Sequence, residues 1–315
     1  MTENAWPQFE QALEMDGVLG ALLTDENSEF LGKLGARYDA IKPDQIKAKA
    51  KPAIPKVFHQ IWLGGPVPDK LQALSRTWRD RHPDWEFQLW DDERINDFEF
   101  GTSDLFERAS CWGQKSDLLR AEILYQFGGV YVDFDYDNYA SIDDLVERYE
   151  FFGTLRNIFP PFLGWPQMWR SPVIACNSLF GSKPGHPVLA AYLKLVRNYW
   201  DQEELVTFRE DELPKTAILA MGGVAKAARI KETGNRTYLP FNEAVANHVA
   251  TSKGRDILFP PAFFNPLMTG ARMLYIMPDF WIRCRQAGIK WPKVSPYNRK
   301  MPYSLGCHLS NNSWL

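Results

Sequence analysis

The sequence has few cysteines, no long apolar run and no marked excess of one charge. Its four cysteines in 315 residues include no pair at the C-x-x-C spacing, which argues against a disulfide scaffold and favours a reducing compartment. The first residues lack a basic segment followed by an apolar core, and every apolar stretch is interrupted before membrane-spanning length. We therefore expect a cytoplasmic protein without a secretory signal or a transmembrane helix.

The balance of charge excludes one class of function. Basic and acidic side chains number 36 and 39, a formal net charge of −3, so the chain is no nucleic-acid binder by bulk charge. With 45% hydrophobic and 24% charged residues it can bury a sizeable core, which argues against disorder and coiled coil. Aromatic residues make up 14%, and we expect most of these rings in the core.

Two parts of the chain differ in pattern. Residues 1–53 predict a helical extension and a basic linker, with amphipathic helices between residues 7 and 40. The lysines from Ile41 to Lys56 are interpreted as solvated and without a specific role. Residues 54–315 predict one α/β domain, which is the main domain of the chain.

Strands and helices alternate from Val57 onward. We expect strands at 57–63, 85–90 and 130–133, and helices at 68–82 and 114–127. This alternation predicts a mostly parallel sheet flanked by helices, in which ligands bind at the carboxyl ends of the strands. The second half is less regular, with strands expected at 173–180, 237–239 and 305–309 and helices at 187–200, 214–228 and 241–250.

An acidic motif follows one of the predicted strands. Asp133, Asp135 and Asp137 alternate after a Val-Tyr-Val strand, so in an extended chain their carboxylates converge and can hold a hard divalent cation. An EF-hand is excluded, because Asn138 stands where the loop needs glycine and a strand precedes it. Two alternatives stay open. One is a phosphotransferase with Asp133 as nucleophile and Asp135 as acid, and the other is a solvated acidic loop.

Two further elements favour a site at this strand end. Asp117 and Arg120 share a helical face that the Gly128-Gly129 turn folds back toward the acidic strand. Such a pair is usually a surface ion pair, but beside a metal it can accept from and donate to sugar hydroxyls. In the tail, His308 with the amide and hydroxyl side chains that follow offers neutral ligands to a cation.

Three ordered blocks carry a family resemblance. Ile54–Gly64, Ser116–Arg120 and Gly128–Asp135 together resemble the sugar-binding, DXD-containing glycosyltransferases of family 32, and they are similar to the catalytic domain of the large glucosylating toxins. The resemblance implies a GT-A fold for residues 54–315, a nucleotide-sugar donor, Mn²⁺ or Mg²⁺, and retention of anomeric configuration. UDP-hexose is the favoured donor, and GDP-mannose is the alternative.

The resemblance also assigns roles to residues by motif. Trp62 would stack on the nucleobase, and the Asp117 and Arg120 pair would hold sugar hydroxyls. The implied catalytic residues are Asp117, Arg120, Asp133 and Asp135. The implied nucleotide-sugar contacts are Ile61, Trp62, Ser116, Asp117, Arg120, Tyr131, Asp133, Ser313 and Trp314. The implied metal ligands are Asp135, His308 and Asn312.

The acceptor side of the site is less defined. The Gly-Pro pair of many family members is not found, and Met221-Gly222-Gly223 stands in its place. We expect a glycan or lipid-linked acceptor, and no nucleic acid. The aromatic segments 151–169 and 259–281 and the basic tail from Trp281 are favoured as core and active-site walls. The alternative is a peripheral contact with the inner face of an anionic membrane.

Two other classes of function stay open. The first is an effector that glycosylates a partner protein, with residues 1 to 50 as the recognition module. The second is a pseudoenzyme that binds nucleotide without transferring a sugar, which the presence of Asp117, Arg120, Asp133 and Asp135 argues against.

Overall fold

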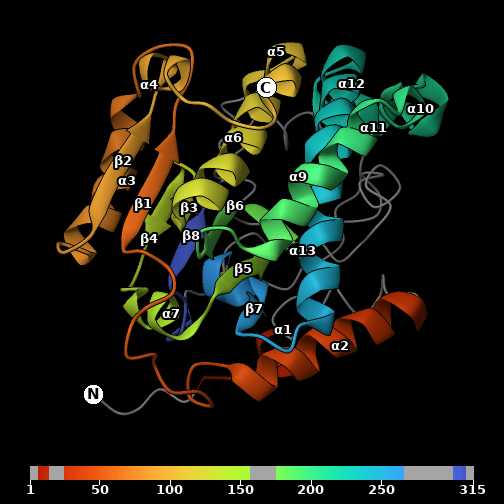
Figure 1. Ribbon diagram of the computed structural model, residues 1–315. Coiled ribbons are helices and arrows are strands. Elements are labelled where there is room, and N and C mark those ends of the chain that lie inside the picture. The colour runs from red at the N-terminus through yellow and green to blue at the C-terminus, as the bar shows by residue number, and fades with distance from the viewer. Residues whose placement is uncertain (1–5, 14–24, 157–174, 266–300, 310–315) are drawn as a thin grey trace.

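A six-stranded sheet forms the centre of the protein (Figure 1). The computed structural model describes residues 6–13, 25–156, 175–265 and 301–309. The strand order is β2-β1-β3-β6-β5-β7, and only β6 runs against its neighbours, β3 and β5. The predicted α/β class, a mostly parallel sheet flanked by helices as in the GT-A expectation, is confirmed.

The strands and helices have the following bounds. The large sheet contains β1 (Val57–Ile61), β2 (Glu86–Trp90), β3 (Gly129–Val132), β5 (Phe151–Leu155), β6 (Ala175–Ser182) and β7 (Asp256–Phe259), and a second, two-stranded sheet contains β4 (Tyr136–Asn138) and β8 (Gly306–His308). The helices are α1 (Phe9–Leu13), α2 (Asp25–Ile41), α3 (Asp69–Arg81), α4 (Asp92–Asn96), α5 (Ser103–Arg108), α6 (Trp112–Phe127), α7 (Asp143–Arg148), α9 (Pro187–Trp200), α10 (Glu203–Val206), η3 (Glu210–Glu212), α11 (Lys215–Met221), α12 (Val224–Thr233), η4 (Gly234–Tyr238), α13 (Leu239–Thr251) and α14 (Pro261–Phe264).

Helices cover both faces of the large sheet. Successive side chains of a strand point to opposite faces, and β1 shows the consequence. Phe58 packs on Trp78 of α3, with ring centroids 5.2 Å apart. The next residue, His59, faces the other way, and its Nε2 lies 3.0 Å from the carbonyl oxygen of Gly128 at the end of α6. The two helices therefore lie on opposite faces of the sheet.

The predicted amino-terminal helices share the main hydrophobic core. α2 lies across the foot of the molecule in Figure 1 and packs against α13 and β7. Its Tyr38 is fully buried and meets the ring of Phe259 edge-on, with centroids 5.9 Å apart. Burying a large aromatic side chain contributes about 2 kcal/mol or more, so α2 stabilises the sheet that it covers.

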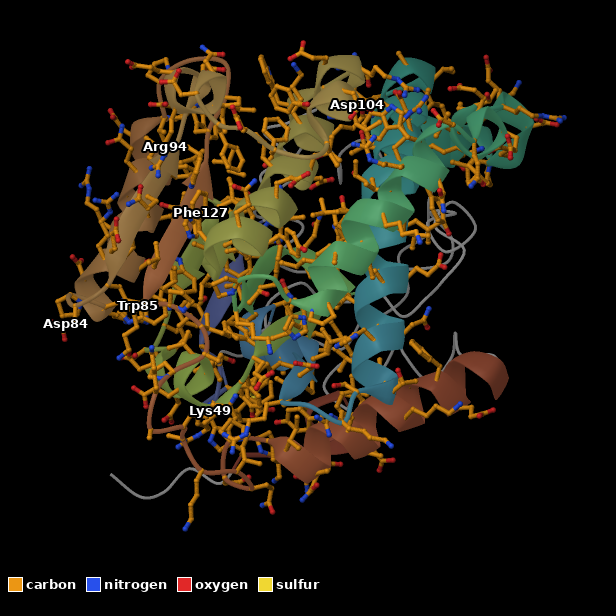
Figure 2. All side chains as sticks on the ribbon, in the orientation of Figure 1. Lys49, Asp84, Trp85, Arg94, Asp104 and Phe127 are labelled. Carbon is orange, nitrogen blue, oxygen red and sulfur yellow. The ribbon has the colours of Figure 1, made fainter. Side chains whose placement is uncertain are left out.

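The lysine-rich segment after α2 is exposed in part, but three of its lysines have partners elsewhere in the protein. Lys42 is buried and donates to the backbone oxygen of Trp6. Lys49, labelled in Figure 2, forms an ion pair with Glu150. Lys56 pairs with Asp143 at 2.8 Å. The prediction of solvated lysines without a specific role is wrong for these three, because their ammonium groups contact carboxylate and carbonyl groups of the packed domain, whereas Lys47 and Lys51 are exposed as predicted.

Two predictions for the second half are also wrong. The strand expected at 237–239 is part of the π-helical turn η4 and the start of α13, so α12, η4 and α13 form one helical run. Packing of this run against α9 and β6 outweighs the local preference of Thr237 and Tyr238 for extended structure. The single helix expected at 214–228 is divided between α11 and α12, because Gly222 and Gly223 adopt φ of 104° and 102°.

The aromatic segments are core wherever the structure describes them. Phe151, Phe152, Phe259, Phe263 and Phe264 have no exposed surface. The rest of these segments, and the basic tail up to residue 300, lie outside the described residues. Among the helices that the structure describes, none is long and apolar enough to cross a membrane.

Candidate active site

Two acidic residues follow β3 at the carboxyl end of the sheet. The backbone N–H of Asp133 donates to Ser178 of β6 at 2.9 Å. The chain then turns, with the N–H of Tyr136 bonded to the carbonyl oxygen of Asp133 at 3.3 Å, and continues as β4. Because of this turn, the three carboxylates do not converge as the extended-chain prediction required. Asp137 instead lies opposite Cys307 of β8, while Asp133 and Asp135 stay together.

β8 brings His308 to the acidic pair. Its Nε2 lies 3.1 Å from Oδ1 of Asp135 and 3.8 Å from Oδ2 of Asp133. The imidazole stacks on the ring of Tyr136, its cross-strand partner, with centroids 4.9 Å apart and planes 7° apart. The backbone N–H of Leu309 also donates to the carbonyl oxygen of Asp135 at 2.7 Å. The stack and the strand pairing hold the imidazole beside the carboxylates.

The donor set fits a divalent cation. One ligand atom from each of Asp133, Asp135 and His308 lies within 4.8 Å of the others. Adjacent ligands of an octahedral ion with bonds of about 2.1 Å are about 3 Å apart, close to the observed spacing. Carboxylate oxygens suit Mg²⁺ and Mn²⁺, and a single imidazole nitrogen favours Mn²⁺ over Mg²⁺. The side chains of Asp133, Asp135 and His308 are 25%, 11% and 13% exposed, which leaves a side open to substrate.

Arg120 of α6 faces the same acidic pair from a buried position. Its Nη2 lies 3.4 Å from Oδ1 of Asp133, 3.2 Å from Oδ1 of Asp117 and 2.9 Å from Oγ of Ser116. Its Nη1 donates to the backbone oxygen of Asn177 at 2.7 Å, and its Nε to that of Ser116 at 3.2 Å. Because every nitrogen has a partner, the plane of the guanidinium is fixed, and its positive charge has a defined position.

Asp117 is buried beneath Arg120. Its Oδ1 accepts from the side-chain amide of Asn177 at 2.8 Å, and its Oδ2 from the hydroxyl of Thr237 at 2.5 Å. With the contact to Arg120, both carboxylate oxygens have protein partners. The i, i+3 spacing on α6 therefore produces a buried cluster, and the alternative of an ordinary surface ion pair is wrong.

Burial governs the electrostatics of this cluster. It raises the pKa of Asp117, against the lowering effect of Arg120 and Thr237. It also raises the pKa of Asp133, where Arg120 acts against it and the Asp135 charge adds to it. Burial disfavours the charged form of Arg120, but Asp133, Tyr131 and Asp117 outweigh it and raise the pKa of the guanidinium. The cluster thus keeps a fixed positive charge next to Asp133.

Tyr131 and Ser116 complete the contacts of Asp133 and Arg120. The phenol of Tyr131 donates to Oδ1 of Asp133 at 2.5 Å. The guanidinium carbon of Arg120 lies 4.4 Å from the centre of the Tyr131 ring. Ser116 Oγ lies 3.4 Å from the same phenol oxygen. Both residues were predicted to contact the nucleotide sugar. They lie within the cluster and orient its charged groups.

Trp62 lies beside the acidic turn, directly after β1. Its indole meets the ring of Phe134, the residue between the two aspartates, with centroids 5.8 Å apart and planes at 83°. Its backbone N–H donates to Trp90 at 2.9 Å, so the chain keeps the sheet register up to this point. Ile61 is buried, with 7% exposed. Of the pair, Trp62 is the residue with surface left for a base.

Gly64 closes the loop after Trp62. It has φ of 84°, and an added Cβ would lie 3.1 Å from the indole ring of Trp112 at the start of α6. Its N–H donates to Asp92 at 2.9 Å. The loop therefore needs glycine here both for its conformation and for its contact with α6.

Several predicted and unpredicted residues remain to be placed. Asn312, Ser313 and Trp314 lie outside the described residues, so their predicted contacts stay predictions. Sequence reasoning missed Asn177 and Thr237, which bind Asp117, and Tyr136, which stacks on His308. Tyr136 follows the DXD motif directly, but Asn177 and Thr237 lie outside the three blocks that carry the family resemblance.

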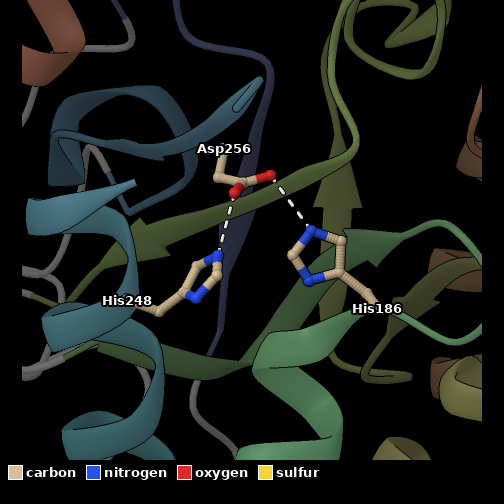
Figure 3. A group of neighbouring side chains, drawn as sticks. All are labelled: His186, His248 and Asp256. Carbon is tan, nitrogen blue, oxygen red and sulfur yellow. Dashed lines mark hydrogen bonds and ion pairs between the residues drawn. The ribbon is translucent and has the colours of Figure 1, made fainter. Parts of the chain in front are cut away.

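A second cluster of potential ligands lies away from this site. Asp256 of β7 accepts from Nε2 of His186 at 3.0 Å and from Nε2 of His248 at 2.9 Å (Figure 3). Nδ1 of His186 accepts the backbone N–H of Val188, so in the neutral ring the proton is on Nε2. A nitrogen that carries a proton has no lone pair for a metal, so Nε2 of His186 is not available as a ligand and the group of three potential ligands is incomplete. The cluster is therefore a hydrogen-bond junction that joins β7, α9 and α13.

Residues 68–152 match the family described as "Glycosyltransferase sugar-binding region containing DXD motif". This segment contains Asp117, Arg120 and both aspartates of the candidate metal site. The resemblance to DXD-containing glycosyltransferases that the sequence predicted is therefore confirmed for this segment.

Three of the curated relatives come from two yeasts and a bacterium. The chain is 29% identical over 170 residues to inositol phosphoceramide mannosyltransferase 3 of Schizosaccharomyces pombe, covering 51% of this chain and 42% of that protein. It is 31% identical over 170 residues to mannosyl phosphorylinositol ceramide synthase SUR1 of Saccharomyces cerevisiae, covering 51% and 40%. It is 28% identical over 183 residues to subversion of eukaryotic traffic protein A of Legionella pneumophila, covering 50% and 27%. The chain thus spans less than half the length of these three relatives.

Solved structures show a more distant likeness. The PaToxG glycosyltransferase aligns with a TM-score of 0.44 and 15% identity, over 88% of this chain and 91% of that one. The galactosyltransferase LgtC, solved with donor and acceptor sugar analogues, aligns with a TM-score of 0.38 and 10% identity, over 80% and 86%.

Proposed function

We propose that the protein is a metal-dependent glycosyltransferase that moves a hexose from a nucleotide sugar to a glycan or lipid-linked acceptor. The observation that carries the proposal is the meeting of two groups at one strand end. Asp133 and Asp135 face His308 on one side, and Asp133 faces the buried Arg120 on the other. The match of residues 68–152 to a sugar-binding region supports it.

The reaction defines what this site must do. Glycosyl transfer breaks the bond between the anomeric carbon and a diphosphate oxygen, so negative charge collects on the leaving diphosphate while the sugar becomes positive. Asp135 and His308 would hold a divalent cation, which would supply Lewis acidity to the leaving diphosphate. Arg120, whose orientation is fixed by its contacts, would bind sugar hydroxyls beside Asp133. Asp117 was assigned the same contact by the resemblance, but both of its carboxylate oxygens accept from protein groups, so its proposed role is to orient Arg120.

The donor base has a binding surface beside these groups. Trp62 lies next to Phe134, which belongs to the acidic turn. If the nucleobase stacks on the indole, the diphosphate of the same nucleotide lies near Asp135. Ser313 and Trp314 are proposed to cover the diphosphate and Asn312 to complete the metal site. Retention of anomeric configuration remains an inference from the family resemblance.

The curated relatives guide the choice of sugar and acceptor. Two of them are named for the transfer of mannose to inositol phosphoceramide or for mannosyl phosphorylinositol ceramide synthesis. GDP-mannose is therefore tested beside UDP-hexoses. A lipid-linked acceptor is the first acceptor to test.

A donor panel tests the proposal before the acceptor is known. Release of nucleoside diphosphate is measured with UDP-glucose, UDP-galactose, UDP-N-acetylglucosamine and GDP-mannose, in Mn²⁺, Mg²⁺ or EDTA. The proposal expects metal-dependent hydrolysis of one donor. If no donor releases nucleoside diphosphate, and UDP or GDP plus Mn²⁺ does not change the melting temperature, the proposal is contradicted and the aspartate-dependent phosphotransferase is favoured.

One observation favours a second candidate acceptor class. A relative from Legionella pneumophila is named for subversion of eukaryotic traffic, and it matches half of this chain. The candidate is an effector that transfers the sugar to a protein side chain. Labelled donor distinguishes the two classes, because a lipid or glycan acceptor carries label into a fraction free of protein, whereas an effector labels a polypeptide.

A further inference from the structure

The π-helical turn η4 interrupts an otherwise continuous helical run. The backbone N–H of Leu239 bonds to the carbonyl oxygen of Gly234, five residues back, whereas an α-helix closes four residues back. The extra residue rotates everything after it by about 100° around the helix axis. η4 therefore sets which side chains of this run face α6, against which it packs.

Two side chains of η4 form contacts that stabilise the turn. Asn235 donates to the backbone oxygen of Lys231 at 3.0 Å. Arg236 pairs with Glu203 at 3.0 Å and with Glu232 at 3.2 Å. A π turn is less favourable than an α turn, and such turns occur frequently at functional sites. These contacts stabilise the unusual geometry.

The product of this geometry is the position of Thr237. The side chain is fully buried, and its hydroxyl reaches Oδ2 of Asp117 at 2.5 Å. The same hydroxyl lies 2.9 Å from the backbone oxygen of Thr233, so the shorter distance makes Asp117 the main partner. The hydroxyl holds the carboxylate oxygen that neither Asn177 nor Arg120 contacts.

We propose that Thr237 is a positioning residue for the donor sugar: its hydroxyl, placed by η4, fixes Asp117, and Asp117 with Asn177 fixes Arg120 against Asp133. This inference rests on the proposed function. With Thr237 in place, Asp117 cannot rotate about its terminal torsion without losing a hydrogen bond on each oxygen. The plane of Arg120 depends on that carboxylate, so the geometry offered to the sugar depends on a residue that does not touch it.

The test removes the hydroxyl and keeps the shape. Thr237→Val retains a β-branched side chain of similar volume, and Thr237→Ser retains the hydroxyl. Thr233→Val is the matched control, since it removes a buried hydroxyl from the same helical run that makes no contact with Asp117. The full chain is used, with the nucleotide sugar that the wild type hydrolyses and with UDP or GDP plus Mn²⁺.

The inference expects turnover of the nucleotide sugar to fall about tenfold to 100-fold in Thr237→Val, the range for a buried acceptor that loses its donor. Binding of the nucleoside diphosphate, which has no sugar, should not change. Thr237→Ser should restore most of the turnover, and Thr233→Val should match the wild type.

Each other outcome overturns the inference in a distinguishable way. Wild-type turnover in Thr237→Val would contradict the positioning role and leave the proposed function standing. If Thr237→Val lowers the melting temperature and weakens nucleotide binding along with turnover, Thr237 only stabilises the fold. A wild type that hydrolyses no donor would overturn the proposed function, and the inference with it.

Discussion

His308 and Tyr136 stack across the β4 and β8 pair with their rings 7° from parallel and 4.9 Å apart. The stack leaves Nε2 of the imidazole 3.1 Å from Asp135, so residues far apart in the chain share one candidate cation site. The position of the imidazole thus depends on strand pairing as well as on its own side-chain torsions.

Replacement of this imidazole should weaken the cation site. In His308→Ala we expect the apparent affinity for Mn²⁺ to fall at least about tenfold, since even a change of an outer-shell partner costs that much. The measurement is donor hydrolysis as a function of Mn²⁺ concentration. An unchanged Mn²⁺ dependence would remove His308 from the proposed ligands.

Loss of the indole at Trp62 should act on donor binding. Stacking of a base on an aromatic ring contributes about 1–3 kcal/mol, and it acts alike in the ground state and the transition state. We therefore expect Trp62→Ala to raise KM for the donor about tenfold or more with little change in kcat. A variant with normal KM would show that the base binds elsewhere.

Arg120→Lys tests whether orientation or charge alone matters. Arg120 contacts partners through Nε, Nη1 and Nη2, and a lysine ammonium cannot reproduce this planar arrangement. We expect kcat to fall about 100-fold, as for the loss of a preorganised donor. Steady-state kinetics beside a thermal melt separates this effect from unfolding. Full activity in the lysine variant would mean that a point charge suffices.

The Asp256 junction should stabilise the fold rather than catalyse. An asparagine can accept from one histidine N–H but not from both, which leaves a buried donor unpaired at a cost of about 1–3 kcal/mol. Asp256→Asn should lower the free energy of unfolding by this amount and leave Mn²⁺ affinity unchanged. Asp201→Asn, which breaks an exposed pair with Arg108, is the control and should cost less than about 0.5 kcal/mol.

The same junction gives a pH dependence of defined sign. Burial alone would raise the pKa of Asp256, but hydrogen bonds from His186, His248 and Ser252 outweigh it and lower this pKa. A carboxylate with a lowered folded-state pKa stabilises fully above its unfolded value of about 3.9, and this stability is lost as the pH falls below it. Urea unfolding should therefore show a steeper acid loss in the wild type than in Asp256→Asn. Parallel curves would contradict this role.

Local sequence signals predicted the end of α6 and the strand that follows it. They did not predict the partners of Asp117, which are long-range contacts. The end of α6 at Gly128, with φ of 66°, and the strand after it follow from glycine chemistry and alternation. Thr237 lies 120 residues from Asp117, and Asn177 lies 60 residues away. No pattern near Asp117 specifies these partners, because only the packed fold brings them there.

The extended-chain argument for the aspartates failed for a related reason. It treated Asp133, Asp135 and Asp137 as equivalent, but the turn before β4 and the pairing with β8 give Asp137 a different neighbour, Cys307. Pairing of a short strand with residues near the carboxyl terminus is a tertiary contact. The group that the structure brings together therefore includes His308, which the sequence predicted as a ligand, in place of Asp137.

The central claim is that Asp135 holds a cation that a donor sugar needs, and the most direct measurement compares Asp135→Ala with Asp137→Ala. Each variant removes one carboxylate, Asp135 from the turn before β4 and Asp137 from β4 itself, and of the two only Asp135 belongs to the cluster with His308. Nucleoside diphosphate release is followed in Mn²⁺ with the donor that the wild type hydrolyses. The account predicts that Asp135→Ala is inactive while folded and that Asp137→Ala retains turnover. Undiminished hydrolysis in Asp135→Ala would contradict it.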